Sequence, residues 1–413
     1  MKVYKFGGAS VKDAAGVRNV EKIVRLEGAN DLMVVVSAMG KTTNALERVL
    51  ELISTGKEEE ALNQWIGVID SHVAIMKELG LQPGSDIRLQ GEIPYDPTLP
   101  YDENYDQIVS MGELMSTQIV AVYLLKQGLS VEWWNMPKLL RTDDTWREAK
   151  VDDAASRAVI RAGWERANRP QVVIAQGFIG GTAGGKRTTL GREGSDYTAA
   201  LLGNYLDAES VTIWKDVPGI LNADPRLEPD TVLIPSLRYQ DAVELSYSGA
   251  QIIHPKTIRP LENKQIPLFV KPFGDPTAAG SKIAADGVGP IDVPVYIWRK
   301  NQILITMRAK DFAFVLEESL SEIFDIINRN RLKVSLIQSS AVTISVCVDN
   351  TRFVPAAIEA LKQHFDVTYN DNLSLLTIRG TTPEILERAK AGRTVMLSQT
   401  TRRTARFVVK ENA

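Results

Sequence analysis

Lys2-Val-Tyr-Lys-Phe-Gly-Gly-Ala-Ser10 is the stretch that decides the fold, because it places a short apolar strand directly before a glycine turn. A helical pattern then continues to about Leu26, and Leu32-Met-Val-Val-Val-Ser37 follows as a mostly apolar run of the kind found in buried parallel strands. Strand, glycine turn and helix alternate in this way along the first half of the chain. The pattern predicts a three-layer α/β sheet with helices on both faces, whose ligands bind beyond the carboxyl ends of the strands.

Further patterns extend this sheet. Strands are predicted at 130–134, 171–176, 210–214 and 266–270, and helices at 107–127 and 196–206. The segment 82–105 is rich in Pro, Gly, Asp and Tyr and lacks periodicity, so it is either an active-site lid or a long surface loop. Residues 273–290 contain several Gly and Pro residues, and we expect them to end the first domain and form a linker.

The rest of the chain has a different pattern. Strands are predicted at 302–307, 333–337, 342–348 and 365–369, with helices at 316–329 and 354–364. This order, β-α-β-β-α-β, is the ferredoxin-like arrangement, and a second, incomplete pass follows with strands at 373–378, 394–398 and 405–409 and a helix at 383–390. We therefore expect a catalytic domain at 1–285, a first regulatory unit at 291–370 and a second, shortened unit at 371–413.

Length and composition limit the function classes. With 413 residues, of which 44% are hydrophobic, the chain is long enough for two or three ordinary globular domains. A formal net charge of -3, with no basic cluster, argues against a nucleic-acid partner. The single cysteine, Cys347, is expected to be a buried strand residue, which excludes a disulfide framework and a cysteine-ligated metal site. No secretory leader and no membrane-length apolar stretch is apparent, so we expect a cytoplasmic protein.

Two glycine-rich stretches contain residues suited to phosphate and carboxylate chemistry. Lys5 with Gly7 and Gly8 could hold a phosphate at the strand end, although such turns are common and the Walker spacing is absent. Gly191-Arg-Glu-Gly-Ser-Asp-Tyr-Thr-Ala-Ala200 presents Arg192, whose planar guanidinium suits a carboxylate. In the same stretch Ser195 or Asp196 could simply cap the helix that follows.

These stretches belong to a larger set that follows a known order. The set consists of Lys5-Phe-Gly-Gly-Ala-Ser10, Val35-Val-Ser-Ala38 with Thr43-Asn44, Met111-Gly-Glu113, Gly191 to Ala200, Trp214-Lys-Asp-Val-Pro-Gly-Ile-Leu-Asn-Ala-Asp-Pro-Arg226 and Ser248-Gly-Ala-Gln-Ile-Ile-His-Pro-Lys256. Over essentially its whole length the chain resembles the aspartokinase branch of the amino-acid kinase family. The resemblance implies ATP- and Mg²⁺-dependent phosphorylation of the β-carboxylate of L-aspartate to 4-phospho-L-aspartate. That reaction is the first step toward lysine, threonine, methionine and diaminopimelate.

The resemblance also implies roles for individual residues. Lys5, assisted by Gly7, Gly8 and Asp196, would be the catalytic set. The substrate-binding residues would be Glu113 for the ammonium group, Arg192 for the α-carboxylate, and Ser37, Thr43 and Ser195 as further contacts. The nucleotide-binding residues would be Lys215, Asp216, Leu221, Arg226 and Gln251. No metal-ligating side-chain set is implied.

The chemistry of the acceptor fits this assignment. A carboxylate with a pKa of about 3.9 is already ionised at neutral pH, so its attack on ATP needs cationic groups rather than a general base. The chain has only three histidines, and we expect His254, in the 248–256 stretch, to be structural. Segment 82–105 would then be a water-excluding cover for a hydrolysable acyl phosphate.

Some residues depart from the family pattern. Gln251 stands where several relatives have a lysine, Lys215 could supply the missing charge, and Glu193 takes a position often held by glycine. The C-terminal region resembles paired ACT domains, which bind amino-acid effectors such as lysine or threonine and favour a homodimer. A chain of this length would be monofunctional. Two alternatives stay open: another amino-acid kinase family enzyme acting on glutamate or a small carbamate-like acid, and a non-catalytic amino-acid sensor.

Overall fold

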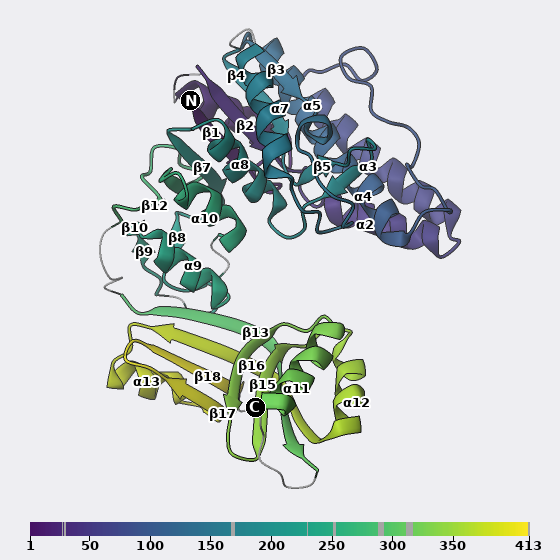
Figure 1. The fold of residues 1–413 in the computed structure, drawn as a ribbon. Coiled ribbons are helices and arrows are strands. Elements are labelled where there is room, and N and C mark those ends of the chain that lie inside the picture. The colour runs from purple at the N-terminus through teal and green to yellow at the C-terminus, as the bar shows by residue number, and fades with distance from the viewer. Residues whose placement is uncertain are drawn as a thin grey trace. The chain divides into compact units, whose positions relative to one another are not determined.

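The computed structural model describes residues 1–26, 28, 30–166, 170–228, 230–250, 253–287, 293–310 and 317–411. The chain divides into two compact units, both drawn in Figure 1. Unit 1 comprises Met1–Ile220, Leu233–Ser246 and Gln251–Gly289. Unit 2 comprises Leu221–Val232, Tyr247–Ala250 and Pro290–Ala413.

Unit 1 is built on an eight-stranded sheet with the order β10-β12-β11-β7-β1-β2-β4-β3. Neighbouring strands are parallel except for β11 and β12. The strands are β1 (Lys2–Phe6), β2 (Leu32–Val36), β3 (Val131–Trp134), β4 (Val172–Gln176), β7 (Ser210–Lys215), β10 (Ser236–Leu237), β11 (Leu268–Pro272) and β12 (Ser281–Ile283). The central strands are buried along almost their whole length, which confirms the predicted parallel α/β sheet.

Helices cover both faces of this sheet. They are α1 (Ala14–Leu26), α2 (Thr42–Ser54), α3 (Glu58–Glu78), α4 (Tyr101–Val109), α5 (Met111–Lys126), α6 (Met136–Leu139), α7 (Asp153–Arg166), α8 (Gly194–Tyr205), α9 (Tyr239–Tyr247) and α10 (Pro255–Glu262). Tyr4 and Phe6 of β1 belong to the same buried cluster as α1, whereas Lys5 contacts α8. Because side chains alternate along a strand, α1 and α8 lie on opposite faces.

Short strands make up the remainder of this half of the chain. They are β5 (Ile179–Gly181), β6 (Arg187–Thr189), β8 (Ile220–Leu221) and β9 (Leu233–Ile234). β5 and β6 form an antiparallel hairpin that leads directly into the 191–200 stretch. This hairpin does not appear among the predicted strands.

Unit 2 contains a six-stranded sheet with the order β14-β15-β13-β16-β18-β17, in which every neighbouring pair is antiparallel. Its elements are β13 (Val295–Ala309), α11 (Glu317–Arg329), β14 (Val334–Ser339), β15 (Thr343–Asp349), α12 (Val354–His364), β16 (Phe365–Arg379), α13 (Pro383–Lys390), β17 (Arg393–Thr400) and β18 (Thr404–Glu411). Helices α11 and α12 pack on one face of β13, β14 and β15 (Figure 1). Cys347 is fully buried in β15, as expected.

Several predicted boundaries differ from the observed ones. The strands predicted at 365–369 and 373–378 are one strand, β16, which runs through residue 370 and so serves both ferredoxin-like passes. The helix predicted at 107–127 begins earlier, with α4, and is interrupted at Ser110. The loop predicted at 82–105 therefore ends at Pro100. The predicted linker at 273–290 includes β12, which belongs to the first sheet, because Ser281–Ile283 extends that sheet beyond β11.

One helical stretch among the described residues, Tyr101–Lys126, is long and apolar enough to cross a membrane by length and composition. However, 78% of its most apolar window is buried inside the protein. The stretch comprises α4 and α5, whose side chains join the buried clusters of unit 1.

Candidate active site

The sheet register brings three predicted site residues to one edge. Phe6 of β1 pairs with Val36 of β2 and with Trp214 of β7, so the carboxyl ends of these strands are level. Lys5, Ser37 and Lys215 lie at or next to these ends. This is the edge at which parallel α/β sheets bind their ligands.

Lys5, Asp196 and Lys215 form a charge cluster at this edge, in which Lys5 and Asp196 are buried and Lys215 is partly exposed. Lys5 Nζ lies 2.7 Å from Asp196 Oδ1, and Lys215 Nζ lies 3.9 Å from Asp196 Oδ2. Burial alone would raise the pKa of Asp196, but the two ammonium groups hold it below its ordinary value. The cluster thus carries more positive than negative charge, as a phosphate-binding site requires.

Close backbone contacts explain the glycines of the first turn. A Cβ at Gly8 would lie 2.7 Å from the carbonyl oxygen of Ala38, and Gly40 N donates to Gly8 O at 2.9 Å. A Cβ at Gly7 would approach Lys5 Nζ to 3.3 Å. The turn after β1 is therefore pressed against the turn after β2, and no other residue fits at Gly8 without displacing backbone.

Glu113 presents an unpaired carboxylate oxygen. It lies in the first turn of α5 and is only 3% exposed, and its Oε1 accepts a hydrogen bond from Ala38 N at 3.1 Å. Its Oε2 is buried and has no hydrogen-bond partner among the described residues. Burial raises the pKa of Glu113 to about 8, although the Ala38 amide and the charge of Lys5 both favour its ionised form. A buried acceptor without a partner is costly, and a cationic ligand would satisfy it.

Arg192 and Glu193 lie on the turn before α8. The Arg192 side chain is exposed and has no hydrogen bond or ion pair with another described residue. Glu193 adopts a left-handed conformation with a φ of 54°, which explains why glycine suits this position. Its Oε2 accepts a hydrogen bond from His254 N at 2.8 Å. The side chain therefore connects the α8 turn to the segment that follows Gln251.

The other substrate-side predictions are placed as follows. Ser195 is buried in the first turn of α8, where a Cβ at Gly177 would come within 2.5 Å of its Cβ. Ser37 N donates to Phe6 O, and Thr43 is half-buried in the first turn of α2. His254 accepts from Lys256 N and caps α10, which agrees with a structural role.

The nucleotide-side predictions are more scattered. Asp216 is exposed next to Lys215. Leu221 and Arg226 belong to unit 2, where Arg226 pairs with Asp224 at 2.6 Å on an exposed surface. Gln251 lies outside the described residues. Of this set, Lys215 is the residue with a described contact to the catalytic residues, through Asp196.

The arrangement can bind anions and one ammonium group. Lys5 and Lys215 supply positive charge beside Asp196, and Glu113 Oε2 is a buried acceptor without a partner among the described residues. Within the described residues, no group of three or more His, Cys, Asp or Glu side chains could hold a metal ion. Asp216 is an exposed carboxylate next to Lys215.

Sequence reasoning did not identify two contributors. One is the backbone N–H of Ala38, which orients Glu113 and carries no signal in the sequence. The other is the Glu193 side chain, whose departure from glycine was visible but whose partner, His254, was not.

Comparison with known proteins identifies the family. The profile of the amino acid kinase family matches residues 1–272. Lysine-sensitive aspartokinase 3 of Escherichia coli is 33% identical over 84% of this chain and 78% of its own length. Aspartokinase 1, chloroplastic, of Arabidopsis thaliana is 30% identical over 85% of this chain, which spans only 63% of that relative.

Solved structures give the same result over the whole chain. E. coli aspartokinase III in complex with aspartate and ADP (R-state) has a TM-score of 0.83 at 28% identity and covers 99% of this chain and 96% of its own. The same enzyme in complex with lysine and aspartate (T-state) has a TM-score of 0.77 over the same shares. The chain therefore belongs to the amino-acid kinase family and is an aspartate kinase with a C-terminal ACT-like regulatory region.

Proposed function

We propose that residues 1–285 transfer the γ-phosphoryl group of ATP to the β-carboxylate of aspartate through the charge cluster at the carboxyl edge of the sheet. A β-carboxylate oxygen forms the new bond to phosphorus, and the bond from phosphorus to the β–γ bridging oxygen breaks, leaving ADP. No proton is transferred. The observation that carries this proposal is the pairing of Lys5 and Lys215 with the buried carboxylate of Asp196.

Lys5 is proposed to stabilise the transferring phosphoryl group. Its ammonium group already has a fixed direction because Asp196 holds it, so little reorganisation is needed when charge develops on the phosphoryl oxygens. Gly7 and Gly8 let the backbone approach those oxygens. Lys215 would contact the nucleotide phosphates, and Mg²⁺ bound to them would neutralise further charge.

Aspartate is proposed to bind with its ammonium group against Glu113 Oε2 and its α-carboxylate against Arg192. The unpaired, buried oxygen of Glu113 favours an amino-acid substrate over a carbamate-like acid, which has no ammonium group. Ser37, Thr43 and Ser195 would supply neutral hydrogen bonds around the substrate. Asp216, Leu221, Arg226 and Gln251 are retained as candidates for the nucleotide side.

Two substitutions separate these roles. Lys5→Ala should lower kcat by about a hundredfold or more with little change in KM for aspartate, because its charge is needed mainly in the transition state. Arg192→Ala should raise KM for aspartate by about ten- to a hundredfold, since charge-assisted hydrogen bonds contribute about 1.5–3 kcal/mol. The exposed Lys57→Ala serves as a matched control for charge removal. Full activity of folded Lys5→Ala enzyme would refute the assignment.

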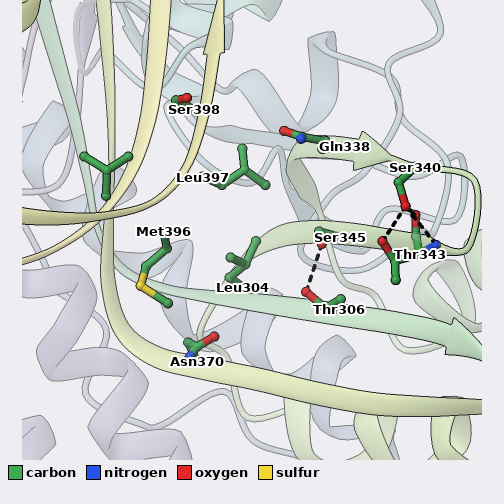
Figure 2. A pocket seen from close by; sticks show the side chains of 11 residues that line it. Leu304, Thr306, Gln338, Ser340, Thr343, Ser345, Asn370, Met396, Leu397 and Ser398 are labelled. Atoms are coloured by element: carbon green, nitrogen blue, oxygen red, sulfur yellow. Dashed lines mark hydrogen bonds between the residues drawn. The ribbon is translucent and has the colours of Figure 1, made fainter.

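For residues 291–370 and 371–413 we propose effector binding in a homodimer, with a cavity of about 470 Å³ as the effector site. It is lined by Leu304, Thr306, Gln338, Ser340, Thr343, Ser345, Asn370, Val395, Met396, Leu397 and Ser398. Figure 2 shows the aliphatic side chains Leu304, Met396 and Leu397 toward one end and the hydroxyls of Ser340 and Thr343 toward the other. None of the described lining residues is charged, so the cavity favours threonine over lysine, whose ε-ammonium would lack a counter-charge.

A further inference from the structure

Asp106 is a buried carboxylate to which the reaction chemistry assigns no role. It lies in α4 and is fully buried. Both carboxylate oxygens accept a hydrogen bond from Arg147 N, each at 3.2 Å. Oδ2 also accepts a hydrogen bond from Thr189 N at 3.0 Å, and Oδ1 accepts one from Thr189 Oγ1 at 2.6 Å. Burial raises the pKa of Asp106 to about 6, although these hydrogen bonds favour the ionised form. A carboxylate kept so deeply buried needs all of these donors.

The donors belong to two segments that meet at the Arg192 turn. Thr189 ends β6, just before Gly191, which has a φ of 73°. A Cβ at Gly191 would lie 3.1 Å from the carbonyl oxygen of Arg147, so the turn rests directly on the Arg147 backbone. Ala149 N also donates to Thr189 O at 2.9 Å. Asp106 thus fixes both sides of the contact that supports the turn.

This support matters because the Arg192 side chain makes no contact of its own with the described residues that would orient it. Its side chain is exposed and has no described protein partner, so only the backbone of the turn determines where the guanidinium can reach. Rotating a turn by a small angle moves the end of an arginine side chain by ångströms, and such misplacement weakens a substrate contact.

The neighbouring residue on α4 extends the same support to the other side of the substrate. Tyr105 OH donates to Glu47 Oε1 at 2.7 Å, and Glu47 lies on α2, whose first turn carries Thr43. The Arg147 guanidinium stacks 4.2 Å from the Tyr105 ring centroid. Consecutive residues of α4 therefore hold the elements that present Arg192 and Thr43.

We propose that Asp106 is a positioning residue for the substrate α-carboxylate, acting through Thr189 and Arg147 on the direction of Arg192. The proposal rests on the role of Arg192 given above. Under this proposal Asp106 affects the binding of the α-carboxylate of aspartate specifically, in addition to any contribution to the stability of the fold.

The test compares Asp106→Asn with Asp102→Asn in the full-length enzyme. Asparagine keeps the shape but turns an acceptor into a donor facing Thr189 or Arg147, so KM for aspartate should rise about tenfold while kcat and KM for ATP change less than about twofold. Asp102 lies on the same helix and also contacts Arg147, at 3.3 Å, but it is half-exposed, so Asp102→Asn should leave KM for aspartate unchanged. An unchanged KM, or a loss confined to kcat, in folded Asp106→Asn would overturn the proposal.

A double variant tests the route. If Asp106 acts through Arg192, Asp106→Asn should add little to the KM of Arg192→Ala, whereas independent effects would multiply and overturn the proposal. If Asp106→Asn fails to fold, Thr189→Val can replace it, because that substitution removes only the Oγ1 hydrogen bond to Asp106. It should also raise KM for aspartate, by a smaller factor, and should likewise add little to the KM of Arg192→Ala. If Arg192→Ala alone leaves KM unchanged, the assigned role of Arg192 fails, which is a different outcome from additivity.

Discussion

Asp196 illustrates how one buried carboxylate can organise two cations. If Asp196 paired with Lys5 alone, the two charges would cancel, and the phosphates of ATP would be attracted only weakly. The second ammonium, from Lys215, keeps Asp196 ionised and leaves a net positive charge at the edge of the sheet. Removing Lys5 or Lys215 therefore also changes the state of Asp196, so single substitutions are best interpreted together with Asp196→Asn.

Glu113 gives a prediction for pH dependence. Burial raises its pKa to about 8, so in the free enzyme the group is largely protonated near neutrality, and binding of the substrate ammonium requires the anion. KM for aspartate should therefore fall as the pH rises from about 6.5 to about 8.5, and aspartate binding near neutrality should release a proton. Glu113→Gln should raise KM and remove this pH dependence. A wild-type KM that is flat over the same range would contradict the assignment.

The same shift has a consequence for stability. Because the pKa of Glu113 is higher in the folded protein than in the unfolded chain, its contribution to stability is fully present below the ordinary value of 4.5 and falls as the pH rises from there to about 8. Activity and stability should therefore respond to this group in opposite directions. Bound aspartate would offset the loss by pairing with the carboxylate.

At the scale of elements, the central strands were predictable because burial on both faces leaves an apolar run. The runs before Gly7 and Ser37 end within a residue of the observed strands β1 and β2. The β5–β6 hairpin was not predictable in this way, since its three-residue strands contain Gly and Thr and are defined by pairing and not by hydrophobicity. β16 was split because Asn370, Asp371 and Asn372 resemble a turn. The structure has an irregularity of the pairing there, between the pairs Leu304–Asn370 and Gln302–Leu373, and the strand pairs with β13 on both sides of it.

The site was predictable in composition but only partly in geometry. Lys5 and Lys215 lie at strand ends, which share an edge in a parallel sheet, whereas Asp196 lies in the first turn of α8 and was assigned to the site only through its motif. The Ala38 amide, which aims Glu113, depends on how two turns pack, and no residue type marks it. Arg226 was expected with the nucleotide residues from its place in a motif, but its described partner is Asp224. The nucleotide role that the motif assigns to Arg226 stays a prediction.

The turn before α8 gives a prediction about stability. The left-handed backbone of Glu193 costs about 1–2 kcal/mol, and the hydrogen bond that its side chain accepts from His254 N offsets this strain. Glu193→Gly removes both the strain and the bond, whereas Glu193→Ala keeps the strain and loses the bond. The thermal midpoint should be highest for the wild type, lower for Glu193→Gly and lowest for Glu193→Ala. The free energy of unfolding of Glu193→Ala should be about 1 kcal/mol below that of Glu193→Gly. Equal stability of the Gly and Ala variants would contradict this account.

At the scale of the whole molecule, the regulatory cavity predicts which effector inhibits. Threonine should lower activity more than lysine at equal concentration, because the described lining of the cavity supplies hydroxyl and amide groups but no carboxylate. Ser345→Ala and Thr306→Val each break the 2.8 Å hydrogen bond between these hydroxyls and should weaken inhibition without changing activity in the absence of effector. Inhibition by lysine alone would show that the effector binds elsewhere.

The homodimer is testable at the same scale. β14 and β17 are the outer strands of the sheet in unit 2, and Tyr369 and Met396 are large apolar side chains exposed in that unit. Exposed apolar side chains on a sheet favour burial against a second copy. Light scattering coupled to gel filtration should give twice the mass of one chain, and a monomer at micromolar concentration would refute the dimer.

The most direct measurement for the central claim traps the product with hydroxylamine. The enzyme with Mg-ATP is offered aspartate, glutamate or no acceptor in parallel reactions, and the hydroxamate is quantified. We expect hydroxamate with aspartate alone, and its loss in Lys5→Ala. Hydroxamate from glutamate instead would indicate a sister enzyme of the family. No hydroxamate with any acceptor, from folded protein that binds ATP, would contradict the account and support a sensor without catalytic activity.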